Sequence, residues 1–427
     1  MARVARRAVL GGLAALAAAP RAQAQAGGRL SPWRPGTLEI HHLATGRGDC
    51  TLVIGPDGTG LMVDAGATAS PPEMSTAPRP DGTRRPGEWI ARYARRRLPD
   101  PDAGLDYFVA THIHPDHIGD VTPRSPPAPG GAYRLTGVSD VAAGLPIRQV
   151  FDRGWPDYAD LPPIDAPFAA NYLAFLKARA AAGLANGRLE PGRADQLVLR
   201  RRPRDFPGFE ARVLAANGRV WTGRGTTARA TFPPLAALAP QDRPTENMAS
   251  VALRIGYAGF AWFCGGDLTA ETSDGALPWA DIEGAAARAC GPVDVAVACH
   301  HGYYDAVGAA AVAALRPRVW VVTPWHVTHP DLKPLERMTG PRLYPGPREL
   351  FLTQVTPEAL KVGDRFLRKA ASVSGHVVVR VEPTGLYSVF VTDPWSEADR
   401  VLAAFGPYAP HVSGHDSATI PASDELD

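Results

Sequence analysis

Cysteine is scarce in this sequence, which has four cysteines among 427 residues. They stand at positions 50, 264, 290 and 299 and form no Cys-x-x-Cys pair. This spacing excludes the disulfide scaffold that stabilises many small secreted domains. Cys264 and Cys299 fall within apolar, strand-like runs, where a cysteine usually packs as a small buried hydrophobic residue.

Long apolar runs are also rare. The one candidate, Ala8–Ala19, follows Arg6-Arg7 and precedes small residues suited to cleavage at Ala22–Ala26. This layout predicts a signal peptide over residues 1–26, because the run is too short for a transmembrane helix. The arginine pair favours export by the twin-arginine route, with an ordinary secretory signal as the alternative. The mature protein is therefore expected in the periplasm or outside the cell, without a membrane span.

A surplus of charge of one sign is missing as well. The formal net charge is +2, but residues 1–26 hold four arginines and no acidic residue. Without that segment the chain is close to neutral, at about −2. Strong non-specific binding to nucleic acids relies on a basic surplus, so it is not expected here.

The order of strand-like and helix-like segments predicts a mixed α/β fold with helices outside the sheets. Apolar strands such as Thr37–Leu43 cluster early, and later strands alternate with helical patterns such as Ala306–Leu315. We expect one domain over residues 27–395, with an elaborated insertion at about 121–245. Residues 396–427 are expected to form a C-terminal tail.

Three polar motifs each follow directly after an apolar strand, at residues 112–117, 264–267 and 299–302. Loops at strand ends, held by a rigid sheet, are where reactive side chains usually lie. Equivalent positions after three strands predict that the motifs share one site.

The first motif reads His112-Ile113-His114-Pro115-Asp116-His117. Imidazole and carboxylate groups are ligands that suit zinc and neighbouring metals in proteins. Four such ligands in so short a stretch would crowd a single ion that must also keep a water position. We therefore expect two adjacent ions, one bound by His112 with His114 and the other by Asp116 with His117.

The first motif resembles the signature of the metallo-β-lactamase superfamily. The chain is most similar to the branch that contains the hydrolase domain of ComEC-type DNA-uptake proteins. The residues that carry the resemblance are Gly46-Arg47-Gly48-Asp49, Met62–Gly66, Thr111–Gly119, Asn247–Ser250, Gly265–Leu268, His300-His301-Gly302 and His329-Pro330. The resemblance implies a four-layer αββα sandwich with the metal ions at one edge.

The resemblance also implies roles for residues outside the first motif. Asp267 would bridge the two ions, and His301 would complete the second ion, with His300 behind it or in its place. Asp64 would lie behind the ligands and orient an imidazole through its free N–H. Two divalent ions are implied, with zinc as the first choice and manganese or iron as alternatives.

The sequence departs from the wider superfamily in two places. Many members supply a further histidine ligand from a strand between the first and last motifs, whereas residues 118–299 contain no histidine. Asn247 or Glu246 would approach the ion that lacks this ligand, unless both only turn the chain before the next strand. Tyr303 follows His-His-Gly, where the ComEC-like pattern usually has serine.

These expectations combine in the hypothesis of metal-assisted hydrolysis. Asp116 or Asp267 would accept a proton, and His329 would face the leaving group. A phosphodiester or phosphate ester is the first expected substrate, because oxygen-rich anions suit a site with two cations. A carboxylic ester, lactone or β-lactam is the alternative substrate, and a metal- or DNA-binding protein without catalysis is the alternative of another class.

Overall fold

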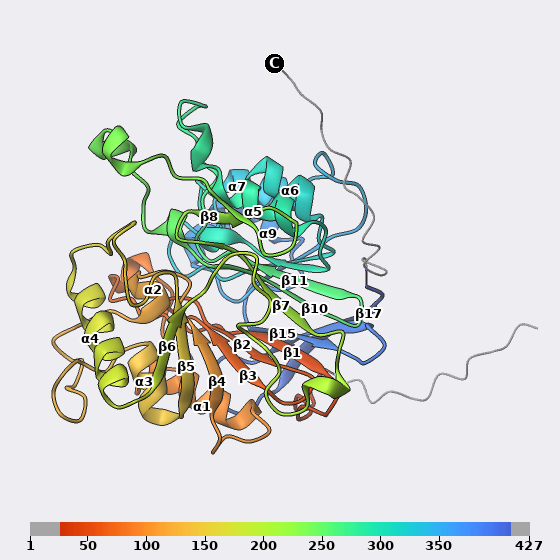
Figure 1. The fold of residues 1–427 in the computed structure, drawn as a ribbon. Coiled ribbons are helices and arrows are strands. Elements are labelled where there is room, and N and C mark those ends of the chain that lie inside the picture. The colour runs from red at the N-terminus through yellow and green to blue at the C-terminus, as the bar shows by residue number, and fades with distance from the viewer. Residues whose placement is uncertain (1–25, 411–427) are drawn as a thin grey trace, which may run out of the picture.

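The computed structural model describes residues 26–410. Two large β-sheets pack face to face, and helices cover both outer faces (Figure 1). The predicted α/β fold with layers in the order αββα is confirmed. The predicted signal peptide lies almost wholly outside the described residues, as does the chain beyond residue 410.

The first sheet has nine strands, and its middle comes from the beginning of the chain. In spatial order the strands are β17 (Val401–Tyr408), β16 (Tyr387–Thr392), β15 (His376–Val381), β1 (Leu38–His42), β2 (Thr51–Ile54), β3 (Gly60–Val63), β4 (Leu105–Val109), β5 (Ile147–Asp152) and β6 (Ala185–Arg188). Strands β3 to β6 run parallel to one another.

The second sheet has eight strands and comes from the later part of the chain. Its spatial order is β14 (Glu349–Leu352), β13 (Val319–Val322), β12 (Val295–Val297), β11 (Phe260–Cys264), β10 (Ala252–Tyr257), β7 (Glu210–Ala216), β8 (Arg219–Trp221) and β9 (Ala228–Ala230). Strands β11 to β14 run parallel to one another.

The helices form the two outer layers. Those beside the first sheet are α1 (Pro86–Arg97), α2 (Pro115–Ile118), α3 (Val138–Gly144) and α4 (Pro167–Ala181). Those beside the second sheet are α5 (Ile282–Cys290), α6 (Ala309–Leu315), α7 (Leu332–Thr339), α8 (Pro357–Val362) and α9 (Asp364–Leu367). Each layer buries a separate apolar cluster against its sheet.

Side chains along β10 and β11 point alternately into two apolar clusters, one between the sheets and one between the second sheet and its helices. Leu253 and Trp262 point toward the opposite sheet and are at most 1% exposed, within the cluster between the sheets. Their neighbours Ala252 and Phe263 belong to the cluster beneath the helices. Successive residues of a strand face opposite sides, so both faces of this sheet need apolar residues.

Both the segment expected as an insertion and the segment expected as a tail supply strands to the sheets. The segment 121–245 supplies β5 and β6 to the first sheet and β7 to β9 to the second. Strand β17 lies within the expected tail and forms the edge of the first sheet. All four cysteines are free, and Cys264 and Cys299 are buried as predicted.

The parallel strands place the polar motifs together. Motif residues 112–117 follow β4, and the other two motifs follow β11 and β12. The carboxyl ends of parallel strands meet at one edge of a sheet, so loops from both sheets converge there. No helix within residues 26–410 is long and apolar enough to cross a membrane.

Candidate metal centre

Four buried side chains converge where the strands end. Asp116, His117, Asp267 and His301 offer ligand atoms that all lie within 4.8 Å of one another. The His117 Nε2 atom lies 3.2 Å from Asp267 Oδ2, and the His301 Nε2 atom lies 3.0 Å from Asp116 Oδ2. Two of these residues follow a strand of the first sheet and two follow strands of the second, so both sheets contribute to the cluster.

Asp267 lies at the centre of a ring of imidazoles. Its Oδ2 atom is 3.7 Å from His112 Nε2, 3.2 Å from His117 Nε2, 3.8 Å from His300 Nε2 and 3.6 Å from His301 Nε2. The structure thus places this carboxylate between the histidines of the first motif and those of the last.

His112 and His114 form the other half of the first motif. The His112 Nε2 and His114 Nδ1 atoms are 3.0 Å apart. His112 is fully buried, whereas His114 is half-buried, and its ring lies 6.5 Å from that of Phe168 on α4. The His112 Nε2 atom also lies 3.7 Å from Asp267 Oδ2, but within the described residues these three side chains do not form a second group as compact as Asp116, His117, Asp267 and His301.

The His300 ring is held by two side chains. Its Nδ1 atom lies 2.7 Å from Asp305 Oδ1, which leaves Nε2 directed toward Asp267 and Asn247. The Asn247 Nδ2 atom lies 3.2 Å from His300 Nε2, while the buried Asn247 Oδ1 atom has no hydrogen-bond partner among residues 26–410. His300 thus lies near Asp267, with the amide of Asn247 beside its ring.

A carboxylate and a backbone carbonyl behind the cluster orient two of its imidazoles. Asp64 accepts hydrogen bonds from the Thr111 backbone N–H and side-chain hydroxyl, and its Oδ2 atom lies 2.8 Å from His117 Nδ1. The His301 Nδ1 atom lies within hydrogen-bond distance of the Thr323 carbonyl oxygen, at 3.2 Å, and 3.3 Å from Asp49 Oδ1. A hydrogen bond at Nδ1 fixes the tautomer of an imidazole and aims its Nε2 at the cluster.

His329 and Trp325 complete the wall around His301. The ring of His329 stacks on that of His301 at a centroid distance of 4.9 Å and an interplanar angle of 18°. The Trp325 indole donates a hydrogen bond of 3.1 Å to Asp116 Oδ2. The buried His329 Nδ1 atom has no hydrogen-bond partner among the described residues.

The backbone around the cluster is packed to close limits. A Cβ atom at Gly66 would lie 1.7 Å from the carbonyl oxygen of Asp116, and one at Gly48 would lie 2.4 Å from the same atom. Only glycine permits this approach, which explains both glycines of the sequence motifs. His300 and His301 adopt left-handed φ angles of 47° and 55°, a conformation that costs about 1–3 kcal/mol per residue and clusters at functional sites.

The donor set fits a divalent cation. The buried Asp267 Oδ1 atom has no hydrogen-bond partner within the described part of the chain. Although burial opposes ionisation, His117 and His301 hold the pKa of Asp267 well below its usual range. A buried, ionised carboxylate with an unpaired oxygen beside several imidazoles needs a positive partner, which a metal ion provides.

Three residues beside the cluster were given no ligand or proton-transfer role from the sequence, although one of them, Asp49, belongs to the motif 46–49. Asp49, Trp325 and Asp305 contact the cluster histidines or Asp116. Asp49 carried a signal, since it stands in a Gly-rich segment directly before a strand. No sequence pattern marked Trp325 or Asp305, because only the folded chain brings them to the motifs.

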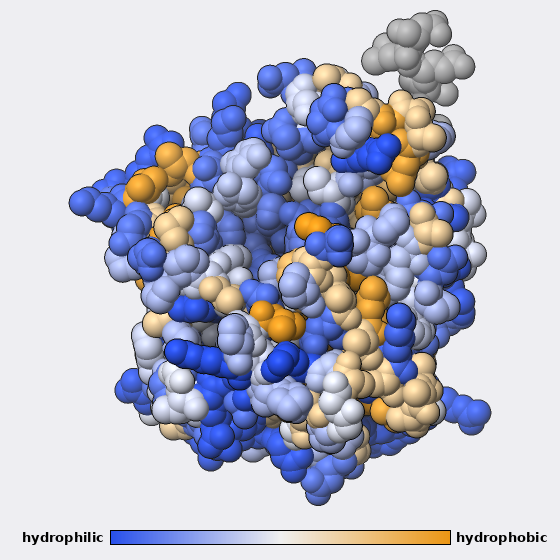
Figure 2. Space-filling view, turned by 90° about the vertical axis from the view of Figure 1, so that its left-hand side faces the viewer, coloured by the Kyte–Doolittle hydropathy of each residue, from blue (hydrophilic) through white to orange (hydrophobic). Residues whose placement is uncertain are grey.

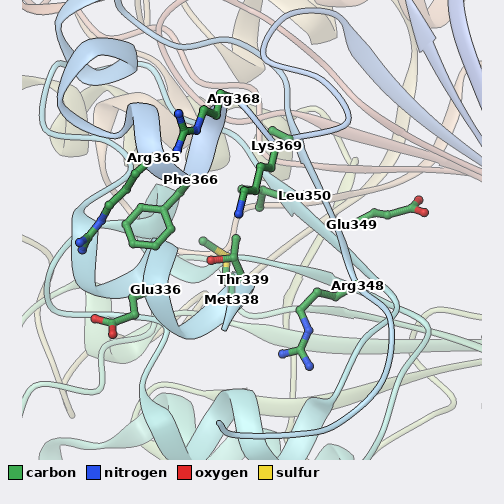
Figure 3. Close-up of a pocket in the computed structure, with 11 residues that line it drawn as sticks. Glu336, Met338, Thr339, Arg348, Glu349, Leu350, Arg365, Phe366, Arg368 and Lys369 are labelled. Atoms are coloured by element: carbon green, nitrogen blue, oxygen red, sulfur yellow. The ribbon is translucent and has the colours of Figure 1, made fainter. Parts of the chain in front are cut away.

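A separate cavity of about 520 Å³ lies among α7, β14 and α9 (Figure 3). Lys369 points toward Thr339 in its middle, whereas Glu349 points away from it. Glu349 begins β14, so the cavity lies at the amino-terminal ends of the parallel strands. The cluster of Asp116, His117, Asp267 and His301 lies at their opposite ends.

The face of the molecule that carries α4 is mostly hydrophilic and is hollowed near its middle (Figure 2).

Residues 44–123 match the Metallo-beta-lactamase superfamily, a segment that holds the first motif, Asp49 and Asp64. No curated protein matches.

Two solved structures are similar at low identity. A mutant of the CmlA beta-hydroxylase shares 12% identity at a TM-score of 0.37, over 81% of this chain and 54% of its own. An inferred metal-dependent hydrolase of Parabacteroides distasonis shares 11% identity at a TM-score of 0.30, over 73% of this chain and 94% of its own. The chain thus spans about half the length of the hydroxylase. With TM-scores this low, neither structure is evidence for the fold or the function.

Proposed function

We propose that this protein, in which residues 44–123 carry a metallo-β-lactamase superfamily domain, is an exported hydrolase that uses two divalent metal ions. One observation carries the proposal: Asp267 Oδ2 lies within 3.8 Å of the Nε2 atoms of four histidines from both sheets. A carboxylate placed between two groups of imidazoles is the arrangement that two adjacent cations require.

The donors divide into two groups around Asp267. One ion would be held by His112, His114 and Asp267, and the other by Asp116, His117, Asp267 and His301. Zinc suits these nitrogen and oxygen donors, and manganese or iron would also fit. When bound, such ions polarise a substrate oxygen and lower the pKa of water toward neutrality.

The side chains of the site would then direct protons and substrate. Asp116 and Asp267 are the carboxylates available to accept a proton from water. Trp325 donates to Asp116 Oδ2 and so keeps that oxygen turned toward His301. His329, which stacks on His301, is the imidazole proposed to face the leaving group, and it would be a neutral ring because burial and the neighbouring His301 hold its pKa well below its usual range.

A phosphodiester or phosphate ester is the proposed substrate. Its oxygens carry negative charge, and two cations can stabilise both the attacking and the leaving oxygen. A carboxylic ester, lactone or β-lactam is the second candidate, since each offers a carbonyl oxygen to polarise. A metal- or DNA-binding role without turnover is the alternative of another class, and the near-neutral charge of the chain speaks against DNA.

Export to the periplasm or beyond belongs to the same proposal. It rests on Arg6-Arg7, the apolar run and the small residues of the first 26 positions. Passage by the twin-arginine route would allow the protein to fold and bind metal before it crosses the membrane.

The substitution Asp267→Ala tests the function. The protein is purified without chelators, its metal content is measured by mass spectrometry, and it is offered bis-p-nitrophenyl phosphate, p-nitrophenyl phosphorylcholine, a lactone and nitrocefin. We expect about two divalent ions per chain and turnover of a phosphodiester by the natural protein. Asp267→Ala should lose metal and turnover, whereas the exposed Asp274→Asn should keep both.

The outcomes separate the candidates. Turnover of the lactone or nitrocefin alone would favour the second substrate class. Metal without turnover of any probe would favour a binding role. Full activity in Asp267→Ala would exclude the proposed position of the two ions.

A further inference from the structure

We propose that the buried ion pair of Arg153 and Glu246 is a positioning device for the metal-binding loop, which rests on the function proposed above. Neither residue contacts the cluster through its own charge. Glu246 instead holds the backbone between His112 and His114, and Arg153 holds Glu246. The pair therefore acts on metal binding through the main chain.

The geometry of the pair is that of a two-point clamp. Arg153 Nε donates to Glu246 Oε1 at 2.7 Å, and Arg153 Nη2 donates to Oε2 at 2.6 Å. The Arg153 side chain is fully buried and that of Glu246 is 5% exposed. Two parallel, charge-assisted hydrogen bonds fix the plane of a carboxylate more firmly than a single contact does.

The clamped carboxylate holds the first motif. The Ile113 backbone N–H donates to Glu246 Oε1 at 2.8 Å. Ile113 stands between His112 and His114, and its buried N–H would otherwise have to find another partner. Because the side chains on either side of this peptide are proposed ligands of one ion, a shift of Glu246 would move both imidazoles together.

The other end of the clamp is anchored in the segment expected as an insertion. Arg153 Nη1 donates to the Leu161 carbonyl oxygen at 3.0 Å and to Asn217 Oδ1 at 2.8 Å. Arg153 directly follows β5 of the first sheet, and Asn217 lies in the β7–β8 turn of the second. The pair thus ties the metal loop to both sheets, at the edge where they meet.

Glu246 also precedes the amide at the His300 ring. Asn247 begins the 3-10 helix η5 (Asn247–Ala249), for which Glu246 is the N-cap residue. The Asn247 Nδ2 atom lies 3.2 Å from His300 Nε2. A fixed Glu246 therefore helps to position both the Ile113 peptide beside His112 and the Asn247 amide beside His300.

A comparison of two double variants separates positioning from stability. Arg153→Met with Glu246→Gln removes both charges but keeps an oxygen that can accept from Ile113 N–H. Arg153→Met with Glu246→Met removes the same charges, fills a similar volume and lacks the oxygen. Removing both partners avoids the buried, unpaired charge that either single substitution would leave.

The measurements are the affinity for Co²⁺, by competition with a chromophoric chelator, and the visible absorption bands of bound Co²⁺, which report ligand geometry. The Gln double variant, which keeps the acceptor for Ile113 N–H but loses the Arg153 clamp, should bind Co²⁺ more weakly than the natural protein and more tightly than the Met double variant. The Met double variant should bind about 10- to 100-fold more weakly, with altered bands. Arg380→Met is the control, because it breaks the buried pair with Glu39 on β1 and should lower the melting temperature without changing Co²⁺ affinity.

The outcomes distinguish this inference from the proposed function. No Co²⁺ binding by the natural protein would overturn both. Co²⁺ binding with the same affinity and the same bands in the natural protein and in both double variants would overturn the positioning role alone. A loss of affinity in Arg380→Met equal to that in the Met double variant would show that general destabilisation is the cause, and would also overturn it.

Discussion

The stability of the protein should fall in mild acid because of His376. This residue begins β15 and is buried, with its ring 4.9 Å from the ring of Tyr93. Its Nδ1 atom accepts a hydrogen bond of 3.1 Å from the Ala44 backbone N–H. Burial lowers the pKa of His376 from 6.5 to about 3.

The charged groups that face His376 act mainly in the same direction. Arg96, His41 and Arg79 lower the pKa further, and Asp393 opposes them. Protonation would also place a proton on Nδ1, opposite the N–H that it now accepts. The folded state therefore holds this imidazole neutral.

The size of the effect follows from the difference between folded and unfolded pKa values. The unfolded chain binds a proton below about pH 6.5 and the folded chain does not, so the free energy of unfolding falls as the pH falls. The contribution is complete above about pH 6.5 and is lost as the pH approaches about 3. One pKa unit corresponds to about 1.4 kcal/mol, so the whole loss is about 5 kcal/mol. Between about pH 7.5 and about pH 5 the loss is about 2 kcal/mol.

The substitution His376→Asn provides the test. Asparagine keeps an acceptor close to the position of Nδ1 and does not titrate. Urea unfolding of both proteins at about pH 7.5 and about pH 5, with excess chelator, gives the free energies of unfolding. The natural protein should lose about 2 kcal/mol more than the variant over this interval. Equal losses in the two proteins would refute the reasoning.

Two further substitutions test the site and the core. Asp64→Asn should weaken Co²⁺ binding about 10- to 100-fold in isothermal titration, because it disturbs the hydrogen bond that fixes the tautomer of His117; unchanged affinity would show that Asp64 only supports Thr111. Leu253→Ala should lower the free energy of unfolding by about 3 kcal/mol in urea, because the side chain is buried between the sheets. A loss below about 1 kcal/mol would mean that the sheets repack around the smaller residue.

The sequence predicted what short, strongly patterned segments encode. Motif residues 112–117 combine ligand chemistry with a position at a strand end, and the structure brings them to Asp267 and His301. The strands around them were predictable because β10 and β11 alternate between two apolar layers. The sequence could not show which of His300 and His301 lies in the compact group with Asp116, His117 and Asp267. Both histidines have left-handed backbone conformations, and only His301 lies in that group.

The features that the sequence did not predict depend on long-range contacts or on weak patterns. Strand β6 reads Ala-Asn-Gly-Arg, which has no apolar periodicity, and it forms because β5 offers an open edge. Strand β17 alternates buried and exposed residues but contains Gly406-Pro407, which is unusual inside a strand. Arg153 and Glu246 are separated by 93 positions, and no local pattern marks a pair across that distance.

The origin of the cluster in both sheets has a consequence for how the chain folds and unfolds. Asp116 and His301 are 185 positions apart, so a cation held by both would act as a cross-link that closes a very long loop. In the unfolded chain, joining both residues through one ion would cost the entropy of closing that loop. The ion would therefore bind the folded state far better than the unfolded one. The metal ion would then link the loops of the two sheets. Its removal would first destabilise the sheet edge that carries these loops.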